Sequence, residues 1–247
     1  MTLDLRGFEL DGEIGATGGP DGAHDPVSAV LGVLGQAFGV VTEHAAPGSG
    51  ARQHTWLDTF DWRLNRAGLV LDHEHNRRGG RLLLSKDEVP LAEQPVSGWP
   101  SRRPKLAADL PAGPVRDQIL KLASPRALLP MATAASVVTV TRLLNADGKT
   151  VARLIVDRST VTRADQTVPL PPRLAITEVR GYLGQARRAE RLLAGAPGVA
   201  PAQDSAFLEA LHALGRHPND YSGGVAADIT AQMPASFAAA NWAVIAP

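Results

Sequence analysis

The sequence predicts an α+β protein in which seven or eight strands form an antiparallel barrel or a strongly curved sheet, with helices packed outside it. Three observations support this fold class. Strand-like segments alternate between apolar and polar residues, turn sequences join most of them as hairpins, and segments with a helical apolar stripe occur at intervals. Hairpin-joined strands in this number suit an antiparallel barrel or curved sheet.

The overall composition is that of one large domain, or of one domain with a fragment of another. The chain has 247 residues, of which 44% are hydrophobic, and its 25 basic and 25 acidic side chains balance. Zero net charge argues against a dedicated binder of nucleic acid or of anionic membranes. The chain has no cysteine, which excludes disulfides, thiolate metal sites and cysteine nucleophiles. Because no segment approaches about 18 uninterrupted apolar residues, we expect a cytoplasmic protein.

The first predicted elements are an extended segment and a helix. Leu10 and Ile14 lie on one parity of the extended segment, and the neighbouring carboxylates lie on the other. Asp25-Pro26 then provides an N-cap followed by a proline at the first helical position. The apolar stripe from Val27 to Phe38 continues this helix.

Residues 53–71 are predicted to form a strand, one helical turn and a second strand. The first part alternates between apolar and polar residues, which is typical of a strand with one buried face. We expect Asp61 to cap a short helix over Trp62 to Arg66, and Gly68 to end it in the left-handed conformation. Leu69 to Leu71 then begin the next strand.

The rest of the chain is predicted to contain hairpins and helices. Arg77 to Gly80 form a hairpin turn, whereas residues 89–111, rich in proline and polar side chains, are predicted to be irregular. The Asn145 to Gly148 turn joins two strands. The predicted strands of this half cover residues 136–144, 150–158, 160–168 and 173–180, and the predicted helices cover residues 115–122, 183–193 and 204–214.

The segment Leu-Asp-Thr-Phe-Asp-Trp-Arg-Leu-Asn-Arg-Ala-Gly-Leu-Val-Leu, residues 57–71, resembles a known family element. It is similar to the Tyr-x-Asp-Thr-x-Asp-x-x-Leu-x-x-x-Gly-x-x-Leu element of the CYTH domain. This family, also called triphosphate tunnel metalloenzymes, includes inorganic triphosphatases and enzymes of adenylate and thiamine triphosphate. The resemblance implies an antiparallel eight-stranded tunnel with helices packed outside, over residues 1–222.

The C-terminal 25 residues suggest a second resemblance. Residues 220–227 have the composition of a linker, and Ile229 to Ile245 are similar to the first helix of CHAD domains, helical modules associated with polyphosphate. Residues 223–247 are therefore predicted to be a linker and the beginning of a CHAD domain in the same polypeptide. The alternative is a C-terminal helix that packs on the barrel.

The CYTH resemblance implies a divalent metal held by carboxylates, because hard cations prefer oxygen ligands. Glu9 and Asp11 match the carboxylates of the family's first strand, but Glu13 stands where the family carries a lysine. Glu178 matches one carboxylate of the closing strand. The predicted metal ligands are thus Glu9, Asp11 and Glu178, for Mg²⁺ or Mn²⁺ if the protein is active; a solvated strand face is the alternative interpretation of Glu9 to Glu13.

The predicted phosphate-binding residues are Lys86, Arg142 and Arg153, because basic groups clamp phosphate oxygens. The family's paired arginines after the Gly-x-x-Leu element are replaced here by Asp72-His-Glu-His75. His73 and His75 could share a metal from one strand face. A polar strand that faces solvent is the interpretation we favour at this stage.

Two functional hypotheses follow from these substitutions. In the first, a degenerate CYTH-like domain binds tripolyphosphate or polyphosphate, or serves as a scaffold next to a CHAD domain, without turnover. In the second, the chain is an active metal-dependent hydrolase of inorganic triphosphate or short polyphosphate. A purely structural adaptor is a third interpretation. No nucleic acid and no membrane are predicted as partners.

Overall fold

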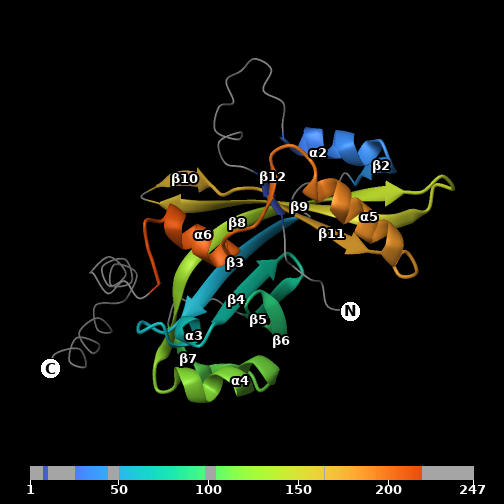
Figure 1. Ribbon diagram of the computed structural model, residues 1–247. Helices are drawn as coiled ribbons and strands as arrows, with labels where there is room; N and C mark the ends of the chain where they lie inside the picture. Colours follow the sequence, from blue (N-terminus) through green and yellow to red (C-terminus); the bar gives the residue numbers. More distant parts are fainter. Residues whose placement is uncertain (1–7, 11–25, 44–49, 98–103, 164, 219–247) are drawn as a thin grey trace. The chain divides into compact units, whose positions relative to one another are not determined.

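The computed structural model describes residues 8–10, 26–43, 50–97, 104–163 and 165–218 (Figure 1). These residues form an α+β fold that is mainly antiparallel sheet with helices, which confirms the predicted fold class. The chain divides into two compact units. Unit 1 comprises Met1–Gln53 and Ala134–Ser205, and unit 2 comprises His54–Thr133 and Ala206–Pro247. No helix of the described residues is long and apolar enough to cross a membrane.

Unit 1 is an antiparallel sheet with two helices on one face. Its strands follow the order β12-β1-β11-β9-β8, with β2 paired to β8 and β10 paired to β9. The strands are β1 (Phe8–Leu10), β2 (Gly39–Thr42), β8 (Ala127–Leu144), β9 (Thr150–Arg163), β10 (Gln166–Pro169), β11 (Arg173–Glu178) and β12 (Val199–Pro201). Only residues 134–144 of β8 belong to unit 1. The helices are α2 (Pro26–Gly35) and α5 (Leu183–Ala194).

The core of unit 1 lies between its helices and one face of its sheet. Every second residue of β9, from Ala152 through Leu154 to Val156, is buried in one cluster with residues of both helices. Val30 of α2 and Leu193 of α5 belong to the same cluster. Because successive strand residues point to opposite faces, Arg153, Ile155 and Asp157 of β9 lie on the face that the helices do not cover.

Unit 2 carries the segment that resembles the CYTH element. Its sheet follows the order β3-β4-β5-β6, and a short strand, β7, pairs with the beginning of β8. The strands are β3 (Ala51–Asp58), β4 (Leu69–Asn76), β5 (Gly79–Lys86), β6 (Val89–Val96) and β7 (Lys105–Leu106). Only residues 54–58 of β3 belong to unit 2. The helices are α3 (Arg63–Arg66), the 3-10 helix η1 (Ala107–Asp109), α4 (Pro114–Ala123) and α6 (Ala206–Ala213).

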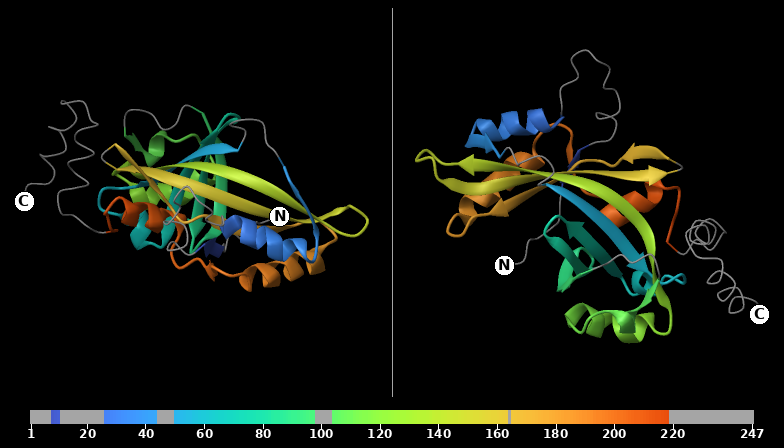
Figure 2. Two further views of the ribbon diagram at one scale, coloured as in Figure 1. Left: turned by 90° about the horizontal axis from the view of Figure 1, so that it is seen from above. Right: turned by 180° about the vertical axis from the view of Figure 1, so that it is seen from behind.

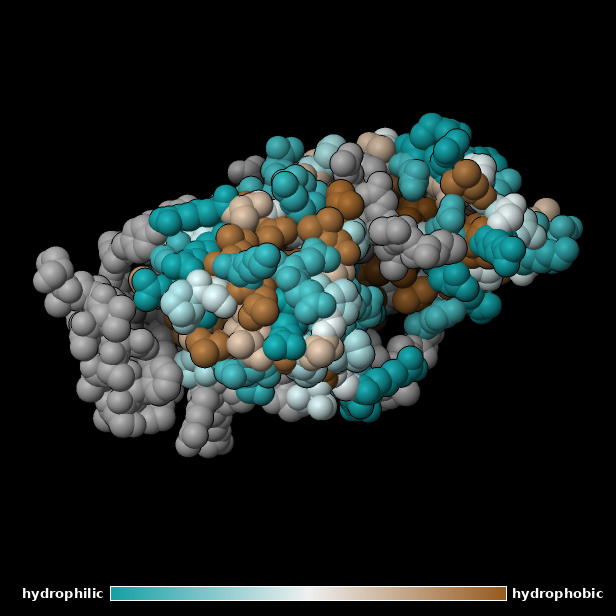
Figure 3. Space-filling model, turned by 90° about the horizontal axis from the view of Figure 1, so that it is seen from below, coloured by the Kyte–Doolittle hydropathy of each residue, from teal (hydrophilic) through white to brown (hydrophobic). Residues whose placement is uncertain are grey.

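The core of unit 2 contains apolar residues of one face of β4 and β5 together with η1 and α4. Leu71, Leu82 and Leu84 are buried in one cluster with Val115 and Ile119. The cross-strand pairs Leu71–Leu84 and His73–Leu82 belong to this face of the sheet. Figure 3 shows apolar side chains in separate groups among hydrophilic ones on the face that it draws.

Asp58, rather than the predicted Asp61, caps the helical turn of the CYTH-like element. One Asp58 carboxylate oxygen accepts a hydrogen bond from the Leu64 amide at 2.9 Å, and the other accepts one from the Asn65 amide at 2.9 Å. Asp61 instead bonds the Arg63 side chain. The prediction missed this because the residue before α3, Trp62, takes a left-handed conformation with φ 56°, which turns the chain back toward Asp58.

The segment predicted to be irregular, residues 89–111, contains the strand β6, so that prediction was wrong. A two-residue turn, Asp87-Glu88, joins β5 to β6, and both residues have positive φ, 49° and 63°. Left-handed residues at both positions match the right-handed twist of the two strands. This turn contains no glycine, so the usual sequence signal of a hairpin was missing.

The strand count and the strand lengths also differ from the prediction. The described residues form twelve strands, against seven or eight predicted. β8 begins at Ala127 rather than at Ser136, and β9 extends to Arg163 (Figure 2). Within each unit, the path of the described strands is open at both ends. The predicted linker and CHAD helix, residues 223–247, lie outside the described residues, as does most of the predicted strand around Leu10.

Candidate functional site

The uncovered face of the unit 1 sheet brings two of the predicted phosphate-binding residues together. Arg142 of β8 and Arg153 of β9 are directly opposite each other in the antiparallel register, so both guanidinium groups belong to one face. The next strand, β11, places Thr177 opposite Arg153. Like charges at opposed positions of a sheet repel each other, so this pair favours an anion between the two side chains.

Glu43 compensates part of this positive charge. Its carboxylate lies 3.4 Å from the Arg142 Nε, in an ion pair whose side chains are 41% and 49% exposed. The Glu43 amide also donates a hydrogen bond to the Val140 carbonyl, which fixes the chain beside β8. An exposed ion pair of this kind contributes little stability. An added anion could therefore displace the Glu43 carboxylate at low cost.

Asp157 forms a carboxylate site on the same face of the sheet. Its Oδ1 accepts hydrogen bonds from the Ser136 hydroxyl at 2.5 Å and from the Ser159 hydroxyl at 3.1 Å. In the register, Asp157 lies opposite Arg173 of β11, and Arg173 lies opposite Glu9 of β1. The backbone therefore places Glu9, Arg173 and Asp157 in one row across three strands.

Of the three predicted metal ligands, Glu178 alone has a side chain that the structure describes. Glu178 lies opposite Ala152, a core residue, and so belongs to the face of the sheet that the helices cover. Glu9 is described by its backbone alone, and Asp11 lies outside the described residues. In the described part of the chain, no group of three or more His, Cys, Asp or Glu residues could hold a metal ion.

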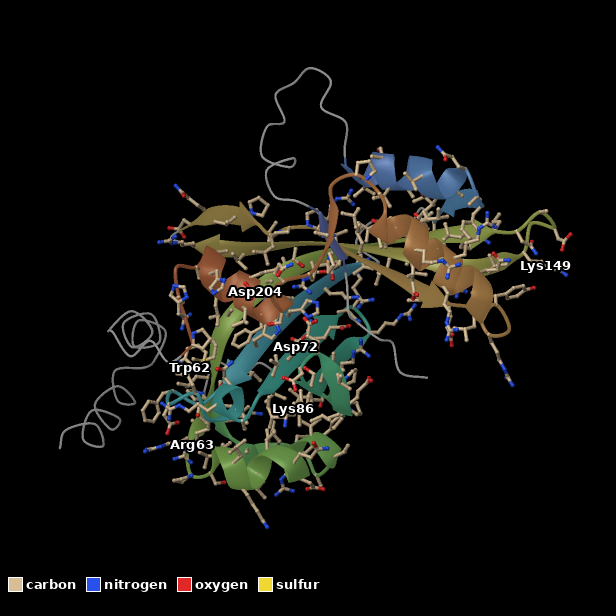
Figure 4. All side chains as sticks on the ribbon, viewed as in Figure 1. Trp62, Arg63, Asp72, Lys86, Lys149 and Asp204 are labelled. Atoms are coloured by element: carbon tan, nitrogen blue, oxygen red, sulfur yellow. The ribbon has the colours of Figure 1, made fainter. Side chains whose placement is uncertain are left out.

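Lys86, the third predicted phosphate-binding residue, belongs to unit 2. It is the exposed last residue of β5, opposite Leu69, and its side chain lies beside Gly68 (Figure 4). Asp72, also labelled in Figure 4, lies further along the neighbouring strand β4.

The acidic residues that replace the family's paired arginines are engaged within unit 2, one in a hydrogen bond to a histidine and one in an ion pair. Asp72 bonds the His54 Nδ1 at 2.7 Å, and Glu74 bonds Arg81 at 2.9 Å. Arg81 also bonds Glu93 of β6 at 2.9 Å. Burial alone would lower the pKa of Arg81, but its bonds to Glu74 and Glu93 raise the pKa above its usual value.

Sequence reasoning missed this network, although one signal pointed to it. Asp72 and Glu74 share a parity on β4, and the register places Arg81 opposite Glu74. The strand β6, which supplies Glu93, was not predicted at all. The face that carries a basic pair in the CYTH family thus carries three carboxylates and one arginine here, together with His54.

No protein-family model matches the chain, and no curated protein sequence matches it. Among solved structures, the chain is similar to an adenylyl cyclase, described as putative, from Hippeastrum that is reported to have a dominant triphosphatase activity. The two share 14% sequence identity over 89% of this chain and 99% of that one, with a TM-score of 0.52. The chain has a CYTH-like fold.

A second solved structure, from Bacillus halodurans and described as that of a putative adenylate cyclase, matches at 12% identity over 78% of this chain and 88% of that chain. Its TM-score of 0.47 is too low to add to the fold assignment. At these identities the comparisons establish the fold of the CYTH-like domain alone.

Proposed function

We propose that this CYTH-like domain binds a phosphate chain, tripolyphosphate or polyphosphate, without efficient turnover. The observation that carries the proposal is the directly opposed pair Arg142 and Arg153 on the uncovered face of the unit 1 sheet. Each of two neighbouring guanidinium groups can donate two parallel hydrogen bonds to phosphate oxygens.

Charge considerations favour a chain of phosphates over a single one. A chain of linked phosphates presents negative oxygens at regular intervals, so it can bridge two neighbouring cations. The Glu43 carboxylate already offers one anionic partner to Arg142. A ligand must therefore bring more negative charge than this one carboxylate, which a phosphate chain does.

Binding is favoured over hydrolysis because the groups that would catalyse it are incomplete in the described residues. Glu178 belongs to the opposite face from Arg142 and Arg153 by its register. Asp72 and Glu74 stand where the family resemblance calls for arginines, and both are paired with basic groups.

The second candidate function is a divalent-metal-dependent inorganic triphosphatase or polyphosphate hydrolase. It is supported by the shared fold with the Hippeastrum protein, which is described as having triphosphatase activity. In this alternative, Mg²⁺ or Mn²⁺ would be held by Glu9 and Asp11 with Glu178, as the family resemblance implies.

The deciding experiment measures binding and turnover on the same protein. Tripolyphosphate binding is followed by calorimetry in the wild type, in Arg142→Ala/Arg153→Ala, and in the control Arg158→Ala, which alters the other face of β9. We expect at least tenfold weaker binding in the double variant and little change in the control. Equal affinity in all three proteins would refute the proposed binding face.

Phosphate release from tripolyphosphate, with Mg²⁺ or Mn²⁺, separates the two candidate functions. We expect no release from the wild type. Release that disappears in Glu9→Ala/Asp11→Ala would establish the hydrolase and overturn the binding proposal.

A scaffold role next to a CHAD domain is proposed from the sequence of residues 229–245 alone. If residues 1–222 form an independent domain, a chain ending at residue 222 should keep both the cooperative unfolding and the tripolyphosphate affinity of the full chain. Loss of either property would show that the remaining residues belong to the domain.

A further inference from the structure

Two histidines at the C-terminal end of α6 lie with their rings close together. The imidazole centroids of His212 and His217 are 5.1 Å apart, with 51° between the ring planes. Both side chains are exposed to solvent, so core packing does not explain why they meet. They belong to unit 2, whereas the proposed phosphate-binding pair belongs to unit 1.

The backbone brings these two rings together. The chain leaves α6 through a Schellman motif, in which the Gly215 amide bonds the His212 carbonyl at 2.8 Å and the Arg216 amide bonds the Leu211 carbonyl at 2.9 Å. Gly215 has φ 69°, the left-handed conformation that this motif requires. The motif turns the chain back at the end of the helix, and His217 follows it directly.

Contacts on both sides of the motif hold this segment in place. Within α6, the ring of the buried Phe207 lies against Trp56 and Trp62, with centroids 5.9 and 6.4 Å apart. After the helix, the Arg216 side chain donates a hydrogen bond to the Met131 carbonyl at 2.6 Å. A segment that is already fixed pays less entropy when its side chains bind a ligand.

We propose that His212 and His217 chelate one divalent ion of the zinc, nickel or copper class. Imidazole nitrogens suit these ions, whereas Mg²⁺ and Mn²⁺ prefer oxygen ligands. With metal–nitrogen distances of about 2.0–2.1 Å, two imidazoles on one tetrahedral ion have ring centroids about 5 Å apart, close to the spacing of this pair. Because both side chains are exposed, rotation about their own bonds is enough to turn one nitrogen of each ring toward the ion.

The surroundings of the pair suit a partly hydrated cation. His212 lies in the last turn of α6, and the C-terminal end of a helix carries partial negative charge. In the described part of the chain, no group of three or more His, Cys, Asp or Glu residues could hold a metal ion, so the two histidines are the protein's share of the ligands. Water reaches the exposed pair and completes the coordination.

The test is calorimetric titration of Zn²⁺ into metal-free full-length protein that carries no histidine tag. We expect one ion per chain in the wild type, and at least about tenfold weaker binding in His212→Ala and in His217→Ala, because each variant loses the intramolecular second contact of a chelate. Gly215→Ala keeps both imidazoles but strains the positive φ of the motif, so it should weaken binding as well.

The matched control is His75→Ala, which removes one exposed imidazole from β4. The ring of His75 lies 6.2 Å from that of His73, which is completely buried, so the expectation of a polar strand facing solvent was wrong for His73 and this pair does not offer two exposed ligands. Unchanged Zn²⁺ affinity in the control, with loss in His212→Ala and His217→Ala, supports the α6 site. An equal loss in the control overturns the proposal, as does a wild-type protein that binds no Zn²⁺.

A second measurement identifies the ligands directly. Zn²⁺ should shift the imidazole NMR signals of His212 and His217 together in the wild type, and a shift confined to other histidines would contradict the proposal. Because tripolyphosphate itself chelates divalent ions, it is titrated separately from Zn²⁺. The tripolyphosphate affinity of His217→Ala is expected to equal that of the wild type, so failure of one proposal is distinguishable from failure of the other.

Discussion

Asp58 is the residue on which the CYTH-like element depends most directly. Its carboxylate accepts hydrogen bonds from the amides of Thr59, Leu64 and Asn65, and its side chain is buried. These three donors would be left without partners inside the protein if the carboxylate were removed. The segment around it keeps its strand–turn–strand shape because one side chain satisfies three backbone groups.

Asp58→Ala is expected to destabilise the protein by about 1–3 kcal/mol, because buried amides lose their acceptor. Asp58→Asn keeps one carbonyl oxygen and should lose less. The measurement is urea unfolding. Asp61→Ala is the comparison, since Asp61 forms partly exposed ion pairs with Arg63 and Arg126, and such pairs contribute about 1 kcal/mol or less. A larger loss in Asp61→Ala than in Asp58→Ala would identify Asp61 as the cap.

Asp61 should affect stability only through its charge. Burial alone would raise its pKa, but hydrogen bonds from Thr59 and Arg63 and the Arg63 charge lower the pKa below 3.8. A carboxyl whose pKa is lowered by folding stabilises the protein above its unfolded pKa and loses this effect as the pH falls through the folded value. Urea midpoints of wild type and Asp61→Asn should therefore differ at pH 7 and converge as the pH falls below 3.8. A constant difference at all pH values would contradict this assignment.

Among the secondary-structure elements, two hairpins show which turns can be recognised in a sequence. Asn145 to Gly148 was predicted, and the structure confirms it: Gly148 has φ 73°, and its amide donates a hydrogen bond to the Asn145 carbonyl at 3.0 Å. The Asp87-Glu88 turn uses the same left-handed region without glycine. Such residues are strained by about 1–3 kcal/mol each.

Asp87→Asn/Glu88→Gly should stabilise the β5–β6 hairpin by about 0.5–1 kcal/mol, because glycine and asparagine adopt positive φ more readily. Thermal unfolding measures the gain. Gly148→Ala, with positive φ in the other hairpin, should show the opposite sign. A loss of stability in the Asp87/Glu88 variant would show that the two side chains make contributions beyond the turn.

Arg142 of β8, Arg153 of β9 and Glu43, which follows β2, are expected to set the affinity of the proposed phosphate site. Glu43→Gln removes the carboxylate that competes for Arg142 and should tighten tripolyphosphate binding several-fold. Calorimetry measures this, and Glu93→Gln, which alters a carboxylate of unit 2, is the control. Weaker binding in Glu43→Gln would mean that Glu43 positions Arg142 rather than competing with the ligand.

For the molecule as a whole, the balanced charge limits how a polyanion can be attracted. With 25 basic and 25 acidic side chains, the chain has no long-range attraction for phosphate. Affinity must come from local groups such as Arg142 and Arg153, and exposed charges are screened over about 8–10 Å at ordinary salt.

Tripolyphosphate affinity should therefore fall several-fold, rather than by orders of magnitude, between low and physiological salt. The same titration in Arg142→Ala/Arg153→Ala should lose most of this salt dependence. If the wild-type affinity for tripolyphosphate does not change with salt concentration, recognition through neutral groups is indicated instead.

The sequence by itself determined the local features of this protein. The alternation along β8 and β9, the Asn145 turn and the segment 57–71 each depend on neighbouring residues, so they could be predicted, as could the α+β class. Arg142 and Arg153 were singled out for the same reason, although their direct opposition had to be seen in the register.

Only the tertiary structure decided which face each side chain belongs to and what covers it. Glu178 matches a family carboxylate in sequence, but pairing with Ala152 puts it on the core face. His73 and His75 are equivalent in sequence pattern, yet His73 is buried in unit 2 while His75 stays exposed. Strand register and burial depend on partners far along the chain, and these long-range contacts are not encoded in any local pattern.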